Sequence, residues 1–181
     1  PLHSLWCKGK TNAIPRDAEA ILLLTEAQAT AMRAIVTREA DILAKEYALT
    51  EPGLRIALAP AEPPVLMQVL DEPSACRVVD ALLLLPNGAF AFHPEMPGVL
   101  DYPSNLGLVA WEASEGAVTL HLHGLVRSNT NSKMDAGVDR LRAFARVLGA
   151  VLETGEAYPA WEYNPVSPLR EICARAWQEL Y

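Results

Sequence analysis

A few polar side chains in this sequence have the type and the position to do chemistry. Arg127 stands at the end of a predicted strand, where its planar guanidinium could hold a carboxylate through two parallel hydrogen bonds. Asn12 precedes a proline-containing turn near the other end of the chain, and its amide offers both a donor and an acceptor. Taken singly, each is more often an ordinary surface or turn residue. Residue type alone therefore leaves both interpretations open.

His121 and His123 are further candidates, because alternate residues of a strand point to the same side. Such a pair could contribute to a zinc site, but zinc needs three or four ligands and no third His or Cys is near in sequence. Exposed histidines are the simpler interpretation, and a metal site is the alternative. The sequence has no Ser-His-Asp order, nucleophile elbow, HExxH pair or glycine-rich phosphate loop. Its motifs by themselves indicate no catalytic machinery.

Two predicted elements position Arg127. The strand over residues 117–127 has apolar side chains at most even positions and polar ones at several odd positions, which predicts that one face lies on a core. A helix follows, with Asn131 or Ser132 as its predicted N-cap and Gly149 as its stop signal. A strand that leads into a packed helix is a rigid support for a guanidinium.

The remaining pattern predicts an α+β fold. The clearest helix begins at a capping box formed by Thr25 and Gln28 and carries an apolar stripe to Tyr47. Other helices are expected over residues 74–85 and from about 168, and other strands at 5–7, 18–24, 54–59, 89–93, 106–112 and 150–153. This order favours an antiparallel sheet with helices mainly on one face, and specifically a ferredoxin-like βαββαβ core with extra helix and strand insertions.

Length and composition limit the class of protein. The 181 residues, 51% of them hydrophobic, predict a single domain over 1–181 with a sizeable core and a proline-rich internal loop at about 50–73. A net charge of -7 argues against a nucleic-acid or membrane partner, and no apolar run is long enough to cross a bilayer. Three widely spaced cysteines indicate no disulfide framework, which favours a cytoplasmic protein.

Several short islands of sequence resemble one family and occur in the same order along the chain. They are NAIPR at 12–16, PNG at 86–88, SNLG at 104–107, HGLVRS at 123–128, and the YPAW, NP and SPL runs between 158 and 169. The chain is similar over nearly its whole length to the aminoacyl-histidine dipeptidases, also called cytosolic non-specific dipeptidases, which are two-zinc metallopeptidases. The similarity is to the lid domain that interrupts their zinc-binding catalytic domain.

The resemblance implies a role for this chain. It would be the lid and dimerisation domain of a zinc-dependent dipeptidase that hydrolyses Xaa-His or a broader set of dipeptides in the cytoplasm. In that family the lid supplies an Asn and an Arg that hold the C-terminal carboxylate of the substrate, and Asn12 and Arg127 occupy the matching positions. The implied partners are a second copy of the chain and the catalytic domain of the same polypeptide. Whether the lid would serve its own or a partner active site stays open.

The resemblance also implies what this chain lacks. The segments that hold the two zinc ions and the catalytic base have no counterpart, and none of His3, His93, His121 and His123 matches a metal ligand. The chain alone is expected to be inactive, with no catalytic residue and no metal ligand. The alternative is a non-enzymatic small-ligand-binding or regulatory dimerisation module. One departure from the family is Pro103, whose missing backbone donor predicts disturbed strand pairing.

Overall fold

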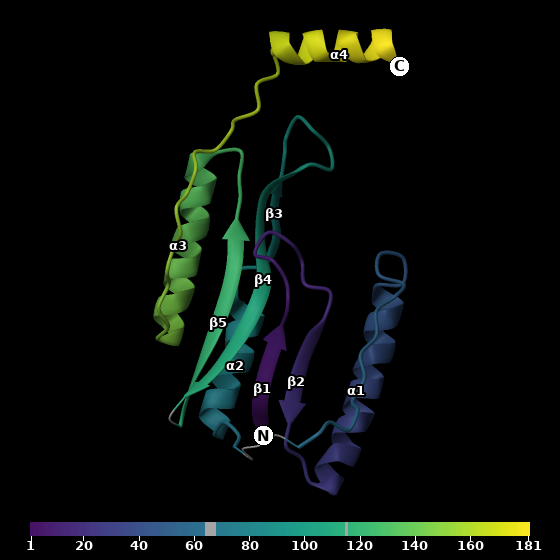
Figure 1. Cartoon of the computed structure of the whole chain (residues 1–181), viewed down its shortest axis with the longest axis vertical. Helices are drawn as coiled ribbons and strands as arrows, with labels where there is room; N and C mark the ends of the chain where they lie inside the picture. Colours follow the sequence, from purple (N-terminus) through teal and green to yellow (C-terminus); the bar gives the residue numbers. More distant parts are fainter. Residues whose placement is uncertain (64–67, 115) are drawn as a thin grey trace. The chain divides into compact units, whose positions relative to one another are not determined.

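The computed structural model describes residues 1–63, 68–114 and 116–181 (Figure 1). Its elements in chain order are β1 (Leu2–Cys7), β2 (Ala18–Leu22), α1 (Glu26–Glu46), α2 (Glu72–Leu84), β3 (Gly88–Phe92), β4 (Leu100–Ser114), β5 (Ala117–Val126), α3 (Asn131–Leu148) and α4 (Pro168–Leu180). The strands of this described part form one sheet in the order β2-β1-β4-β3, and β5 pairs with β4. The pairs β1–β2, β1–β4 and β3–β4 are antiparallel. The predicted α+β class is confirmed.

The chain folds as two compact units, and β4 and β5 each contribute residues to both. Unit 1 comprises Pro1–Lys10, Pro15–Leu83 and Gly107–His123, and unit 2 comprises Thr11–Ile14, Leu84–Leu106 and Gly124–Tyr181. Asn12 and Arg127 therefore both belong to unit 2, although they lie far apart in the sequence.

In unit 1, α1 begins as its sequence predicts. The Thr25 hydroxyl accepts a hydrogen bond from the Gln28 amide at 3.3 Å, and Gln28 Oε1 accepts one from the Thr25 amide at 3.0 Å. These two bonds complete the predicted capping box and satisfy donors that a helix N-terminus otherwise leaves unpaired. Met32, Val36, Ala40 and Leu43 of the predicted stripe are half-buried, whereas Tyr47, the C-cap, is 42% exposed.

Two predicted strands are wrong, because residues 54–59 and 150–153 form neither helix nor strand. In unit 1, β1 already pairs with both β2 and β4, and the Leu58 carbonyl accepts from the Arg33 guanidinium of α1 at 3.2 Å. In unit 2, the chain leaves α3 through Gly149, and Val151 is 87% exposed. An apolar run becomes a strand only when its backbone pairs with a neighbouring strand, and neither of these segments does so. The observed order of elements therefore departs from βαββαβ at these two places.

The predicted proline-rich loop at 50–73 is described only in part. Residues 51–63 and 68–71 form no helix or strand, and α2 starts at Glu72. Residues 64–67 of this loop lie outside the described residues.

In unit 2, α3 starts slightly earlier than predicted. Thr130 is the N-cap, without a side-chain hydrogen bond, and Asn131 Oδ1 instead accepts from the backbone amide of Ala160 at 2.8 Å. The predicted N-caps Asn131 and Ser132 are wrong, because both residues lie inside the helix. The side-chain oxygen of Asn131 accepts from Ala160 instead of capping. Gly149 ends the helix as predicted, with φ of 65°.

Pro103 lies inside β4 without interrupting it. The register between β3 and β4 shifts on either side of Ala91, next to the Ala89–Pro103 pair. The strand therefore continues through Pro103, and the irregular register lies on the side of β4 that faces β3. The Pro103 carbonyl is unaffected and accepts from the Arg127 amide at 3.1 Å.

The core of the described residues is small. The buried hydrophobic residues are Leu2, Cys7, Ala81 and Val109 in unit 1, and Tyr102 and Ala145 in unit 2. Apolar side chains of the helices stay exposed, including Leu83 of α2 at 77% and Trp177 of α4 at 66%. The prediction of a sizeable core was wrong for this part of the chain, since much apolar surface faces outward. No described helix combines the length and the apolarity that crossing a membrane requires.

Candidate functional site

Arg127 is the first residue after β5. Its backbone amide donates to the Pro103 carbonyl at 3.1 Å, which extends the pairing of β5 with β4 by one residue beyond the end of β5. Its side chain is exposed, and no carboxylate of the described residues lies within ion-pair distance of the guanidinium. The backbone is therefore held in place while the charged group is available to a ligand.

The turn after Arg127 is fastened to Asp101 of β4. This carboxylate is only 3% exposed, and it accepts hydrogen bonds from the Asn129 amide at 3.3 Å, the Ser128 hydroxyl at 3.5 Å, and the Lys133 ammonium. The hydrogen bond from Lys133 is the largest influence and holds the pKa of Asp101 below its ordinary value of 3.8, although burial acts in the opposite direction. The carboxylate is therefore charged at neutral pH.

Asn12 lies in a turn that one side chain of β4 fastens. Asn105 Nδ2 donates to the Thr11 carbonyl at 2.8 Å and to the Ala13 carbonyl at 3.0 Å. These two carbonyls stand on either side of Asn12, so both donors of a single amide hold the turn. The Asn12 side chain itself is exposed and makes no hydrogen bond to another described residue.

Unit 2 thus carries both predicted residues, and the backbone around each is tied to the same strand, β4. Arg127 is tied to Pro103, and the turn of Asn12 is tied to Asn105. Because a strand rises about 3.3 Å per residue, roughly 7 Å of β4 separates these two anchors. A guanidinium and a primary amide held in this way have the donors that a carboxylate ligand requires. Their action on one shared ligand stays a prediction.

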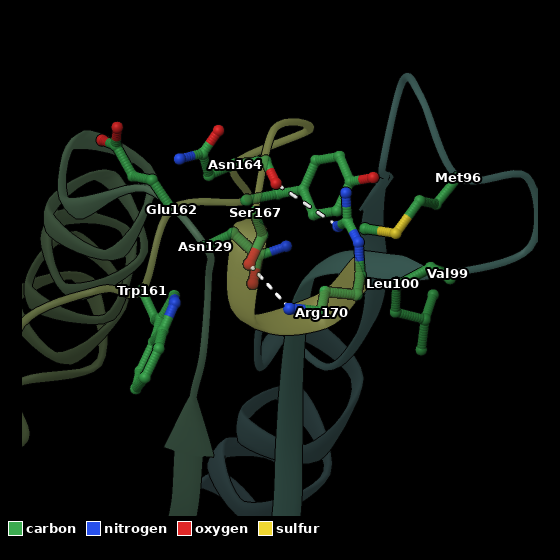
Figure 2. A pocket seen from close by; sticks show the side chains of 10 residues that line it. Met96, Val99, Leu100, Asn129, Trp161, Glu162, Asn164, Ser167 and Arg170 are labelled. Carbon is green, nitrogen blue, oxygen red and sulfur yellow. Dashed lines mark hydrogen bonds between the residues drawn. The ribbon is translucent and has the colours of Figure 1, made fainter. Parts of the chain in front are cut away.

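A cavity of about 320 Å³ opens in unit 2 beside Asn129, which belongs to the turn after Arg127. Figure 2 shows the side chains that line it. Its walls are Met96, Val99, Leu100, Asn129, Trp161, Glu162, Tyr163, Asn164, Ser167 and Arg170. The Arg170 guanidinium donates to the carbonyls of Asn164, at 3.3 Å, and Pro165, and it lies 5.3 Å from the Tyr163 ring centroid. A cavity with an aromatic wall and a few polar groups is suited to a small organic ligand.

Sequence reasoning missed this cavity. The loop from Tyr158 to Pro165 is rich in aromatic residues and proline, a composition that is equally typical of a packed surface loop. The signal that could have revealed a site is Arg170, placed in the first turn of the helix directly after that loop.

The two histidines of β5 do not build a metal centre. The rings of His121 and His123 stack with centroids 6.1 Å apart, and His121 Nε2 lies 3.3 Å from Glu112 Oε2. Throughout the part of the chain that the structure describes, no three or more His, Cys, Asp or Glu side chains form a group that could hold a metal ion. The residues present therefore do not fit the zinc centre that the resemblance places in the parent enzyme.

Known proteins match this chain over nearly its whole length. It is 26% identical over 171 residues to the cytosol non-specific dipeptidase of Escherichia coli (strain K12), an alignment that covers 94% of this chain and 34% of the relative. The crystal structure of aminoacylhistidine dipeptidase from Vibrio alginolyticus shares the fold with a TM-score of 0.78 and 24% identity, over 99% of this chain and 36% of that one. No family model matches.

The resemblance read from the motifs is thus confirmed. This chain is a dipeptidase-related segment that spans about a third of the length of the relatives it matches.

Proposed function

We propose that this chain is the substrate-positioning lid and dimerisation domain, over residues 1–181, of a longer zinc-dependent dipeptidase that acts on Xaa-His or a broader set of dipeptides. Arg127 and Asn12 bind the free C-terminal carboxylate of the substrate. The main support is that both side chains are exposed in one unit while the backbone around each is tied to β4. The chain that carries them is related to a dipeptidase. An enzyme limited to dipeptides must recognise that free terminus, and a bidentate arginine with an amide donor is suited to it.

In this proposal the chain binds and orients the substrate, and the peptide bond is cleaved elsewhere. Arg127 neutralises the carboxylate, and Asn12 donates a hydrogen bond to it, so the dipeptide keeps one orientation. The two zinc ions and the catalytic base belong to the remainder of the longer protein. The isolated chain is inactive, and the site of action is the cytoplasm.

Exposed apolar helix faces support the proposed partners. In α4, Leu169, Ile172 and Trp177 follow a helical spacing and are 71%, 54% and 66% exposed. In α2, Val79 and Leu83 are 50% and 77% exposed. Apolar surface of this kind gains free energy when a partner covers it. We assign the α4 face to the catalytic domain of the same polypeptide and the α2 face to a second copy of the chain.

The test is discrimination between a free carboxylate and an amide. Glycyl-histidine and glycyl-histidinamide are titrated into the isolated chain and followed by NMR. The dipeptide should bind more tightly than its amide. Arg127→Met should weaken dipeptide binding by about 10- to 100-fold, because a hydrogen bond to a charged group contributes about 1.5–3 kcal/mol. Asn12→Leu should weaken it by a smaller factor, and both variants should bring the two ligands closer in affinity.

Arg142→Met is the matched control, since this exposed arginine of α3 pairs with Asp139 at 2.8 Å and has no proposed part in binding. It should leave the discrimination unchanged. Equal binding of the two ligands by the unaltered chain contradicts the carboxylate site. Hydrolysis of glycyl-histidine by the isolated chain with added zinc contradicts the proposed division of labour.

The second candidate is a non-enzymatic small-ligand module, and the cavity beside Asn129 favours it. A ligand bound there would contact the aromatic wall. Binding of that ligand should be lost in Tyr163→Ala and should be unchanged in Arg127→Met. That pattern of affinities would favour the second candidate over the first.

A further inference from the structure

We propose that Asp101 and Asn105 of β4 are positioning residues that determine where Arg127 and Asn12 stand. This inference rests on the proposed carboxylate site and deepens it. Neither Asp101 nor Asn105 is assigned a contact with the ligand. Each acts through the backbone that carries a binding side chain.

Asn105 holds the turn of Asn12 from both sides. Its amide nitrogen has two donors, which go to the carbonyls of Thr11 at 2.8 Å and Ala13 at 3.0 Å. The carbonyls of the residues before and after Asn12 are therefore both bound to one side chain of β4. Because this turn is exposed, water would replace the two hydrogen bonds if they were lost. The main loss would be the fixed direction of the Asn12 side chain rather than stability.

Asp101 completes the support of Arg127. The amide of Arg127 is held by Pro103, and the two residues that follow it, Ser128 and Asn129, both donate to the Asp101 carboxylate. A residue whose backbone is held on both sides has little freedom in φ and ψ. The backbone from which the Arg127 side chain extends is therefore fixed relative to β4.

The stretch of β4 from Asp101 to Asn105 spaces the two binding side chains. Its anchors at 101, 103 and 105 alternate along the strand and span roughly 13 Å at about 3.3 Å per residue. A neighbouring bond keeps this stretch in place, since the Ser104 hydroxyl donates to the Pro86 carbonyl at 2.7 Å. One strand thus aligns residues from two distant parts of the chain.

The experiment compares the full chain with Asn105→Leu, Asn105→Gln and Asp101→Asn. Glycyl-histidine and its amide are titrated into each, and backbone order is followed by heteronuclear NMR relaxation. Asn105→Leu should reduce the carboxylate discrimination by about tenfold. It should also loosen residues 11–14, but leave Arg127 ordered. Asn105→Gln keeps the amide and should restore part of the discrimination. Asp101→Asn should show the opposite pattern of order, with a loosened turn at 127–130 and an ordered turn at Asn12.

Asn87→Leu is the matched control. This variant removes the hydrogen bond from the Leu106 amide to Asn87 Oδ1, one residue beyond Asn105 on the same strand. The bond does not hold a segment that carries a binding side chain. The variant should leave the discrimination unchanged. An equal loss in Asn87→Leu and Asn105→Leu would show a general disturbance of β4 and overturn the inference.

The outcomes separate this inference from the proposed function. If Arg127→Met abolishes discrimination while Asn105→Leu and Asp101→Asn both retain it, the positioning role is wrong and the carboxylate site stands. If the unaltered chain binds dipeptide and amide equally, the carboxylate site is wrong and the positioning role falls with it.

Discussion

At the scale of single residues, Asp101 is a charged group that the described part of the fold both buries and pairs. The hydrogen bond from Lys133 is the main cause of its lowered pKa, burial acts in the opposite direction, and the hydrogen bond from the Asn129 amide lowers the pKa further. The Lys133 side chain is 41% exposed, so water screens part of the attraction. Asp101 consequently joins the start of α3 to β4 while it holds the turn after Arg127.

We expect Asp101→Asn to lower the free energy of unfolding by about 1–3 kcal/mol at neutral pH, because a buried acceptor of charged and backbone donors is weakened. The folded pKa of Asp101 lies below its ordinary value of 3.8, so its stabilisation is present above that value and is lost as the pH falls through the folded pKa. Denaturant titrations of both proteins from about pH 7 to about pH 2 measure this, and the two curves should converge in acid.

Asp139→Asn is the control for that titration. The Asp139–Arg142 pair lies on the surface of α3, with side chains 70% and 61% exposed, and such pairs contribute about 0.5 kcal/mol or less. A difference between the unaltered chain and Asp101→Asn that is undiminished in strong acid would contradict the assignment of this stabilisation to the ionised carboxylate.

At the scale of elements, α3 approaches β4 and β5 through Gly137. A Cβ at this position would lie 2.6 Å from Tyr102 Oη and 2.7 Å from Val126 Cγ1. The Arg140 guanidinium of α3 also packs on the Tyr102 ring, 5.8 Å from its centroid, and lies 5.2 Å from the ring centroid of Phe90. The absence of a side chain at Gly137 therefore allows α3 to support the strand end from which Arg127 extends.

Gly137→Ala should lower the free energy of unfolding by about 1–2 kcal/mol, because an overpacking cost of about 2–3 kcal/mol at this tight contact exceeds the gain of about 1 kcal/mol in helix propensity. Gly155→Ala is the control, since no atom lies within 4 Å of its added Cβ. It should change stability by about 0.5 kcal/mol or less. Chemical denaturation of the two variants provides the comparison, and an unaltered or raised stability of Gly137→Ala would refute the tight contact.

At the scale of the whole molecule, the described residues leave a large apolar area in water. The outer side of α2 carries Val79 and Leu83, both exposed, while Ala81 between them is buried. One side of this helix thus packs within unit 1 and another is available for association. This exposed side supports the proposed homodimer.

Val79→Glu combined with Leu83→Glu should convert a dimer of the chain into a monomer, because the charges would have to lose water at the interface. Light scattering coupled to size-exclusion chromatography measures the mass, and circular dichroism should show unchanged helix content. Val151→Glu is the control, since that residue is 87% exposed and lies outside every described helix and strand. A monomeric unaltered chain at about 100 μM would contradict the proposed interface.

The sequence by itself determined the local elements and the candidates for chemistry. The capping box at Thr25, the stop at Gly149 and the start of α4 at Ser167 and Pro168 depend on residues a few positions apart, so their patterns were sufficient. Residues 54–59 and 150–153 resemble strands locally, but a strand also needs a neighbour at a free edge. That neighbour is a property of the assembled fold.

Only the tertiary structure decided how Asn12 and Arg127 are held. The hydrogen bonds of Asn105 to the turn of Asn12, and of Asp101 to the turn after Arg127, join segments that no periodicity relates. The cavity walled by Trp161 and Tyr163 also draws on residues from several segments. Local pattern reports which face of an element is apolar, whereas a site depends on which distant backbone groups the folded chain brings within hydrogen-bond distance.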